Sequence, residues 1–142
     1  MLKAGKIPPD ILKSSVFPYI GNLRKEVLVH SELGEDSSII DFGDKVAVLS
    51  TDPITGADIH SSYLAVYVSC NDIAACGAKP IGILVTLLLP VGSDEHILKE
   101  LMESVHEASR KIGIEVLGGH SEITSSVVKP VISATAIGIA DK

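Results

Sequence analysis

Three aspartates, Asp36, Asp52 and Asp72, stand at points in the sequence where a carboxylate is either costly or well placed to meet a ligand. Asp36 belongs to Gly34-Glu35-Asp36-Ser37-Ser38, which directly precedes a predicted strand. The small residues around the two acids would let a phosphate or a metal ion approach the backbone closely. A solvated turn capped by an aspartate is the alternative, and this motif taken alone favours the turn.

Asp52 follows the apolar strand KVAVLST, in the sequence Thr51-Asp52-Pro53. Ligand sites are often built from side chains at the ends of buried strands, so an acid at this position is well placed to bind one. Asp-Pro also favours a turn, and simple termination of the strand explains the residue equally well.

Asp72, preceded by Asn71, interrupts an otherwise apolar segment that is predicted to be a helix. It lies four residues after Val68 and eight after Leu64, on the same helical face. A carboxylate on a buried stripe is costly unless it is paired or bound to a metal ion. A structural acid bonded to backbone N–H groups is the alternative, but this position favours a functional role.

A fourth polar segment, Leu117-Gly118-Gly119-His120-Ser121-Glu122, follows a short predicted strand. Two successive glycines predict a loop whose N–H groups could face phosphate oxygens. His120 and Glu122 point to the same side if the segment is extended. An ordinary Gly-Gly turn is the alternative.

The charge of the chain limits its partners. The formal net charge is -6, and no segment gathers Lys or Arg, which argues against nucleic acid or an anionic membrane as the main partner. A protein of this composition needs metal ions or backbone N–H groups to bind a phosphate. The sequence contains no P-loop, no G-x-G-x-x-G and no zinc motif.

The two cysteines, Cys70 and Cys76, are too few for a secreted disulfide scaffold and are predicted to be buried free thiols in a reducing compartment. The first twenty residues lack the apolar core of a signal peptide. The longest apolar run, Ile81 to Val91, is shorter than the roughly 20 residues of a membrane-spanning helix. We therefore expect a soluble, cytoplasmic protein.

The elements that must position these residues alternate between helix and strand signals. Residues 1–25 read as a mobile N-terminal arm, and residues 26–142 as one domain. We expect α+β architecture, with a mixed sheet and helices on one face, because the turn Gly43-Asp44 predicts an early hairpin. The predicted helices are Asp10–Val16, Ser61–Gly77 and Ser93–Ile112. The predicted strands are Glu26–His30, Ser37–Phe42, Lys45–Thr51, Pro80–Leu89, Ile114–Leu117 and Val131–Ala140.

Taken in order, GEDSS, STDP, VSCNDIAACGAKP and LGGHSE resemble the N-terminal domain of the aminoimidazole ribonucleotide (AIR) synthetase-related superfamily. That superfamily includes selenophosphate synthetase, thiamine-monophosphate kinase and the hydrogenase-maturation protein HypE. The resemblance runs from about Gly34 to the C-terminus. TDPITGA, NDIAACGAKP and GGHSEIT together are most similar to HypE.

The resemblance implies a site for ATP and Mg²⁺. By motif, Asp36, Asp52 and Asp72 would be the metal ligands. Asn71 and the Gly118–Gly119 loop would line the phosphate site, with His120 and Glu122 near it, and Lys6 could reach the phosphates. Hard oxygen ligands suit magnesium, and three converging acids would repel one another without a cation.

The resemblance also implies a homodimer, in which two sheets pair into a β-barrel, and a HypE-like enzyme that uses ATP to phosphorylate a carbonyl-type oxygen. The sequence has GEDSS where the family commonly has GDDAA, and the family's C-terminal domain is absent, so we expect the isolated domain to be inactive. A protein acceptor or maturation partner is a further expectation. A small-molecule kinase of the thiamine-monophosphate type and a non-catalytic dimerisation or nucleotide-binding module remain as alternatives.

Overall fold

The computed structural model describes residues 2–56 and 59–142 of the chain. Helices and strands follow one another along these residues in the order α-β-β-β-α-β-α-β-β, as the sequence predicts. Their bounds are α1 Pro9–Ser15, β1 Val27–Val29, β2 Ser37–Asp41, β3 Lys45–Thr55, α2 Ile59–Ala75, β4 Lys79–Pro90, α3 Glu95–Ile112, β5 Glu115–Thr124 and β6 Val131–Asp141.

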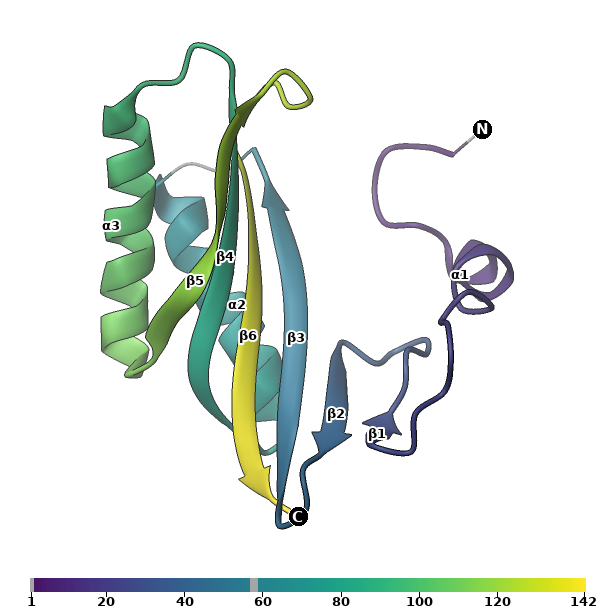
Figure 1. The fold of residues 1–142 in the computed structure, drawn as a ribbon. Helices are drawn as coiled ribbons and strands as arrows, with labels where there is room; N and C mark the ends of the chain where they lie inside the picture. The colour runs from purple at the N-terminus through teal and green to yellow at the C-terminus, as the bar shows by residue number, and fades with distance from the viewer. Residues whose placement is uncertain (1, 57–58) are drawn as a thin grey trace.

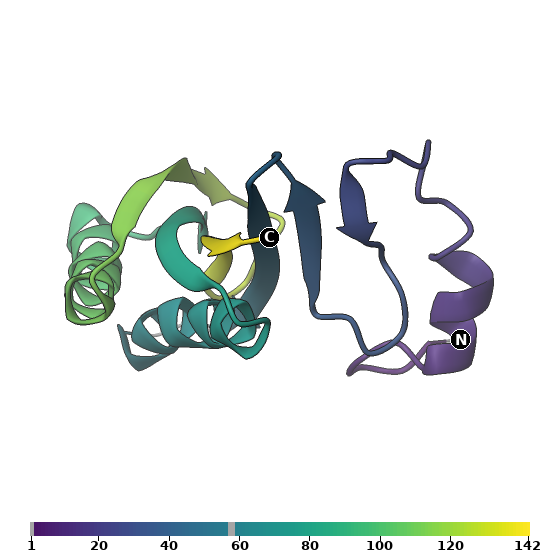
Figure 2. The same ribbon diagram turned by 90° about the horizontal axis from the view of Figure 1, so that it is seen from below.

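The strands of the described residues form one six-stranded sheet in the order β1-β2-β3-β6-β4-β5. Only the β4–β5 pair is parallel, and β2 and β3 form the predicted hairpin. Helices α2 and α3 pack together against one face of the sheet (Figures 1 and 2). No helix of the described part of the chain covers the opposite face, which we call the open face. The predicted mixed α+β architecture with helices on one face is confirmed.

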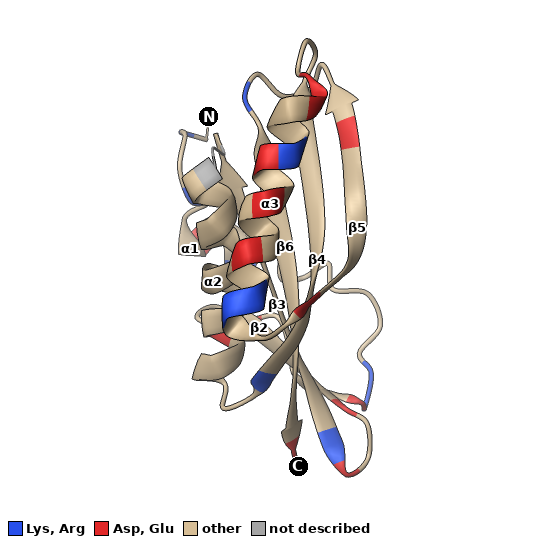
Figure 3. Ribbon diagram, turned by 90° about the vertical axis from the view of Figure 1, so that its left-hand side faces the viewer, with Lys and Arg blue, Asp and Glu red and all other residues tan. Residues whose placement is uncertain are grey.

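The core lies between the sheet and these two helices and is aliphatic. It is built from buried residues of β3, β4, β6 and both helices, including Val48, Leu87 and Ile132. Helix α3 contributes Leu101, Val105 and Ala108, which lie three or four residues apart. Figure 3 shows that charged residues follow the exposed side of α3. The helix is amphipathic because its apolar residues recur every three or four positions.

The ends of α3 follow from local chemistry. The carboxylate of Asp94 accepts a hydrogen bond from the backbone N–H of Ile97 at 3.0 Å and caps the helix. Gly113 terminates it in the left-handed region, with φ of 81°. Asp94 and Gly113 thus determine where α3 starts and ends, and the end of α3 determines where β5 can begin.

Helix α2 corrects one step of the sequence argument. Leu64 and Val68 are 55% and 37% exposed, so the stripe on which Asp72 lies is not buried. The residues that α2 buries include Ala65, Val66 and Ile73. An almost uniformly apolar helix does not reveal by its pattern which side faces the core.

Strand β3 is longer than predicted, because it continues through Asp52 and Pro53 to Thr55. Asp52 therefore lies within a strand and not at its end. The pairing of β2 with β3 reaches Ser50, whereas the pairing of β6 continues to Thr55. Pro53 thus lies where β3 has a neighbour on one side, a position in which a missing N–H is tolerated.

Strand β5 is also longer than predicted, and Gly118 and Gly119 lie inside it. The predicted loop at these glycines is wrong. A Cβ atom on Gly119 would lie 1.7 Å from the carbonyl oxygen of Val85 on β4, and Gly119 has φ of 147°. Close approach of the two backbones therefore explains this glycine without any ligand.

The N-terminal arm contains α1, which buries no side chain, and the arm lies beside the β1 edge of the sheet (Figures 1 and 2). Both cysteines are free, but Cys76 is exposed, so the predicted pair of buried thiols is correct only for Cys70. Burial raises the pKa of the Cys70 thiol to about 11. Among the described residues, no helix is both long and apolar enough to span a membrane.

Candidate functional site

The candidate site is built around the buried hydroxyl of Ser50 on β3. Antiparallel pairing places Ser50 opposite Ser37, the first residue of β2. The Ser50 Oγ lies 2.8 Å from Oδ2 of Asp72 on α2 and 3.0 Å from the carbonyl oxygen of Asp36. The hydroxyl has one hydrogen, so it can donate to only one of these acceptors at a time. Ser50 thus ties together the segments that carry two of the predicted aspartates.

Asp52 joins this group because it lies two residues after Ser50 on the same strand, on the same side of the sheet. Burial raises the pKa of Asp52 above its ordinary value, and a hydrogen bond with the Asp72 carboxyl raises it further. The charges of Asp72 and Asp36 act in the same direction. The structure therefore brings Asp36, Asp52 and Asp72 together, as the sequence predicts. Repulsion from Asp36 and Asp72 raises the pKa of Asp52.

Lys6 of the arm supplies a positive charge that acts on Asp52. Its ammonium group acts on Asp52 and lowers the carboxyl pKa, against the larger effects of burial and the neighbouring acids. Lys6 also lines a cleft of about 490 Å³ between the arm and the loop before β2, together with Phe17, Glu35 and Asp36. The arm thus carries a basic side chain close enough to act on Asp52, and contact of Lys6 with phosphates stays a prediction.

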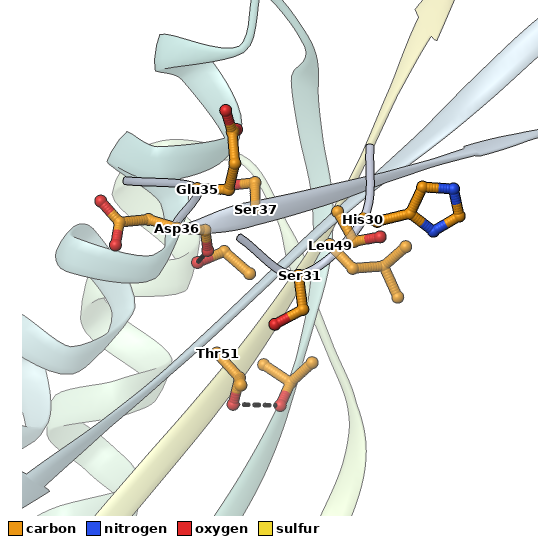
Figure 4. Close-up of a pocket in the computed structure, with 10 residues that line it drawn as sticks. His30, Ser31, Glu35, Asp36, Ser37, Leu49 and Thr51 are labelled. Atoms are coloured by element: carbon orange, nitrogen blue, oxygen red, sulfur yellow. Dashed lines mark hydrogen bonds between the residues drawn. The ribbon is translucent and has the colours of Figure 1, made fainter. Parts of the chain in front are cut away.

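A second cavity of about 320 Å³ lies at the start of β2 (Figure 4). Six of its ten lining residues carry hydroxyl groups, with Ser37 and Ser50 among them, and Glu35 and Asp36 border it. The Oγ1 atoms of Thr51 and Thr135 lie 2.8 Å apart within it. Hydroxyl donors beside carboxylates can bind a metal-bound oxyanion.

The remaining predicted residues lie apart from the aspartates within one chain. His120 pairs across the sheet with Thr86, which pairs with Ser133, which in turn pairs with Pro53. Three strand spacings separate His120 from β3, or about 14 Å. Its ring Nε2 lies 2.8 Å from Oε2 of Glu122, so these two side chains do point to the same side. Asn71 is exposed on α2 next to Asp72.

The carboxylates of this site partly fit the ligand requirements of a magnesium ion. Within the described ranges, no three acidic, histidine or cysteine side chains are already gathered at metal-binding distances. Mg²⁺ usually takes only one or two protein carboxylates and completes its coordination with water and phosphate oxygens. The contacting pair Asp52 and Asp72 meets that requirement, with Asp36 close enough to raise the pKa of Asp52.

Sequence reasoning missed Ser50 and Ser37. The signal was present, since Ser50 is the polar residue that ends the apolar run VAVLS, and a buried polar side chain needs a partner. Its partner lies on α2, 22 residues further along the chain. The contact between Ser50 and Asp72 becomes visible only in the folded chain, where α2 packs against β3.

Comparison with known proteins shows the family of this chain. Residues 34–140 match the family AIR synthase related protein, N-terminal domain. The chain belongs to this family. The matched range begins at the GEDSS motif and contains all three aspartates, the described site residues of β3 and α2, and the whole of β5.

Among AIR synthase-related proteins, a Methanocaldococcus jannaschii protein named for hydrogenase expression and formation is 28% identical over 97% of this chain and 43% of its own length. The thiamine-monophosphate kinase of Rhodopirellula baltica is 31% identical, over 76% of this chain and 40% of its own. The solved HypE–HypF complex contains a chain that is 27% identical, with a TM-score of 0.65, over 76% of this chain and 37% of its own. The chain spans about two fifths of the length of these curated relatives.

Proposed function

We propose that this domain binds ATP as its magnesium complex where β2, β3 and α2 meet. The observation that supports the proposal is the contact between the Asp52 and Asp72 carboxyls, with Asp36 close enough to raise the Asp52 pKa further. Like charges held this close destabilise a fold unless a proton or a cation lies between them. A divalent cation is the ligand that removes this repulsion.

Each residue of the site has a separate task in this proposal. Magnesium, when bound, neutralises the charge on the triphosphate and holds its oxygens. Asp52 and Asp72 hold the metal, and Asp36 adds a carboxylate from the loop before β2. Ser50 fixes the Asp72 carboxylate by a hydrogen bond of 2.8 Å. Lys6 approaches from the arm and opposes the phosphate charge. Phosphoryl transfer needs mainly such positioning and charge neutralisation.

We propose further that the whole protein is a HypE-like maturation enzyme or synthetase, which uses ATP to phosphorylate a carbonyl-type oxygen of its acceptor. The relative named for hydrogenase expression and formation supports this reading, because it aligns with nearly the entire chain, including the arm. The complex of HypE with HypF supports a protein as acceptor or partner.

A kinase of the thiamine-monophosphate type is the second candidate, supported by the similarity to the kinase of Rhodopirellula baltica. Transfer of phosphate to a small monophosphate by the full-length protein would favour this candidate. Binding of ATP without release of ADP for any acceptor would favour a non-catalytic module instead.

The open face of the sheet supports a homodimer. Leu84 and Ile139 are 41% and 37% exposed there, and Leu49 and Ile137 are half-buried beside them. His120 and Glu122 project on this face as well, since they pair with Thr86 and Leu88 of β4. Two copies that pack these faces together would bury the apolar residues and place His120 and Glu122 at the interface.

Substitution Asp72→Asn tests the nucleotide site, because it removes one carboxylate and keeps the shape of the side chain. We expect calorimetry to show about 100-fold weaker binding of Mg–ATP, since loss of a charged contact costs about 2–3 kcal/mol. Asp44→Asn removes the same charge from the exposed β2–β3 turn and is the control. A folded wild-type protein that releases no heat with Mg–ATP would refute the proposed function.

A further inference from the structure

The hydroxyl of Ser37 is a buried polar group that makes no hydrogen bond within the described part of the chain. Only 9% of the residue is exposed, and its Oγ is shielded from water. A buried hydroxyl without a partner is unfavourable, and most buried polar atoms in proteins are satisfied. Such an atom at the edge of a ligand site calls for an explanation in terms of the ligand.

The position of Ser37 provides that explanation. It follows Asp36 directly and lies opposite Ser50 in the β2–β3 pairing. Opposite residues of an antiparallel pair point to the same face, with Cβ atoms about 5 Å apart. Because Ser50 contacts Asp72 on that face, Ser37 also faces the side of the sheet where the aspartates meet.

Neighbouring hydroxyls differ from Ser37 in having partners. Ser38 donates to the carbonyl oxygen of Val29 at 2.9 Å, and the hydroxyls of Thr51 and Thr135 contact each other at 2.8 Å. Ser50 is engaged with Asp36 and Asp72. All five residues line the same cavity of about 320 Å³. Ser37 is therefore the buried hydroxyl of this lining that makes no hydrogen bond within the described residues.

We propose that Ser37 donates its hydroxyl hydrogen to a phosphoryl oxygen of the metal-bound triphosphate. Serine has three staggered χ1 positions, so rotation about one bond turns the hydroxyl from its shielded position toward the cavity. A neutral donor next to the three carboxylates attracts the phosphate without adding to their repulsion. Ser37 thus gives the site a donor in a protein with few basic side chains. This inference rests on the proposed binding of Mg–ATP and assigns one residue within it.

Substitution Ser37→Ala separates a ligand contact from a structural role, because the two roles move stability and affinity differently. Removing an unpaired buried hydroxyl should raise the melting temperature of the free chain by about 2–4 °C. The same substitution should weaken Mg–ATP binding about 10-fold in calorimetry, as expected for loss of a hydrogen bond to a charged group. Ser38→Ala, the neighbouring residue with an occupied hydroxyl, should leave the affinity unchanged.

The outcomes distinguish this inference from the function on which it rests. Wild-type chain that fails to bind Mg–ATP overturns both. Wild-type chain that binds, with Ser37→Ala binding equally well, overturns only the role of Ser37. A lower melting temperature in Ser37→Ala with unchanged affinity also overturns it, because the hydroxyl would then serve the fold. Equal loss of affinity in Ser38→Ala would show a general effect of the strand and would overturn it as well.

Discussion

Replacing Asp52 by asparagine should make the ligand-free domain more stable and should abolish its response to magnesium. In the folded chain Asp52 is partly buried and contacts the Asp72 carboxyl, and the charge of Asp36 raises the Asp52 pKa further. Two like charges at about 4 Å interact by about 4 kcal/mol in a protein environment of intermediate polarity. Asp52 is only partly buried, so solvent screening reduces the recoverable part to about 1 kcal/mol. This corresponds to a melting temperature that is higher by about 2–4 °C.

The pH dependence of this effect has a definite sign. The folded chain holds the Asp52 proton more tightly than the unfolded chain, because the folded pKa is raised. Stability is therefore highest below the ordinary aspartate pKa of about 4 and falls as pH rises toward and through the folded pKa. The difference in stability between Asp52→Asn and wild type should vanish near pH 4 and be largest at neutral pH.

Thermal denaturation between about pH 4 and pH 8, with and without magnesium and ATP, measures both effects. Ligands that bind only the folded state raise its apparent stability, so Mg–ATP should stabilise wild type and not Asp52→Asn. Asp44→Asn controls for the change in net charge. A destabilised Asp52→Asn protein, or one whose stability difference from wild type does not change with pH, would refute the argument that the aspartates repel one another in the free domain.

Two further predictions test the fold and the assembly. Gly119→Ala should lower the free energy of unfolding by about 3 kcal/mol in chemical denaturation, because the new Cβ would lie 1.7 Å from the Val85 carbonyl oxygen. Gly92→Ala is the control: Gly92 has φ of 93° and open space around it, so this change should cost only about 1 kcal/mol. Leu84→Glu on the open face should weaken a homodimer at least about 100-fold in sedimentation experiments, whereas Val128→Glu, on a side chain that is 93% exposed, should not. Unchanged association of Leu84→Glu would exclude the open face as the interface.

The fold was predictable where one element carries its own signal. The sequence of α3 has regularly spaced apolar residues, an aspartate at its start and a glycine after its end. These signals predict a helix, and its observed end at Ile112 is the predicted one. The β2–β3 hairpin follows from Gly43-Asp44. Strands β3 and β5 were predicted too short, because Asp-Pro and Gly-Gly usually interrupt strands. Pro53 is tolerated within β3 because the strand has no neighbour on one side there. Gly119 is required within β5 because the backbone of Val85 lies too close for a side chain.

The candidate site was predictable in membership and not in geometry. Asp36, Asp52 and Asp72 could be chosen from their motifs, and they do approach one another. Asp72 was predicted to lie on a buried stripe, but Leu64 and Val68 of that stripe are exposed. What holds Asp72 in place is Ser50, and a contact between residues on different elements leaves no periodic trace in the sequence.

The distribution of the site over the chain explains what a single copy can and cannot do. The three aspartates and Ser50 lie on segments joined by direct contacts, so one chain positions the groups proposed to bind metal and phosphate. His120 and Glu122 lie on β5, beyond two intervening strands, and face the open side of the sheet. Three strand spacings, about 14 Å, separate them from β3 within one chain, so we expect any contact with the same nucleotide to come from another copy. Weaker Mg–ATP binding in His120→Ala only under dimeric conditions would therefore tie the nucleotide site to the open face, whereas an equal loss in the monomer would separate them.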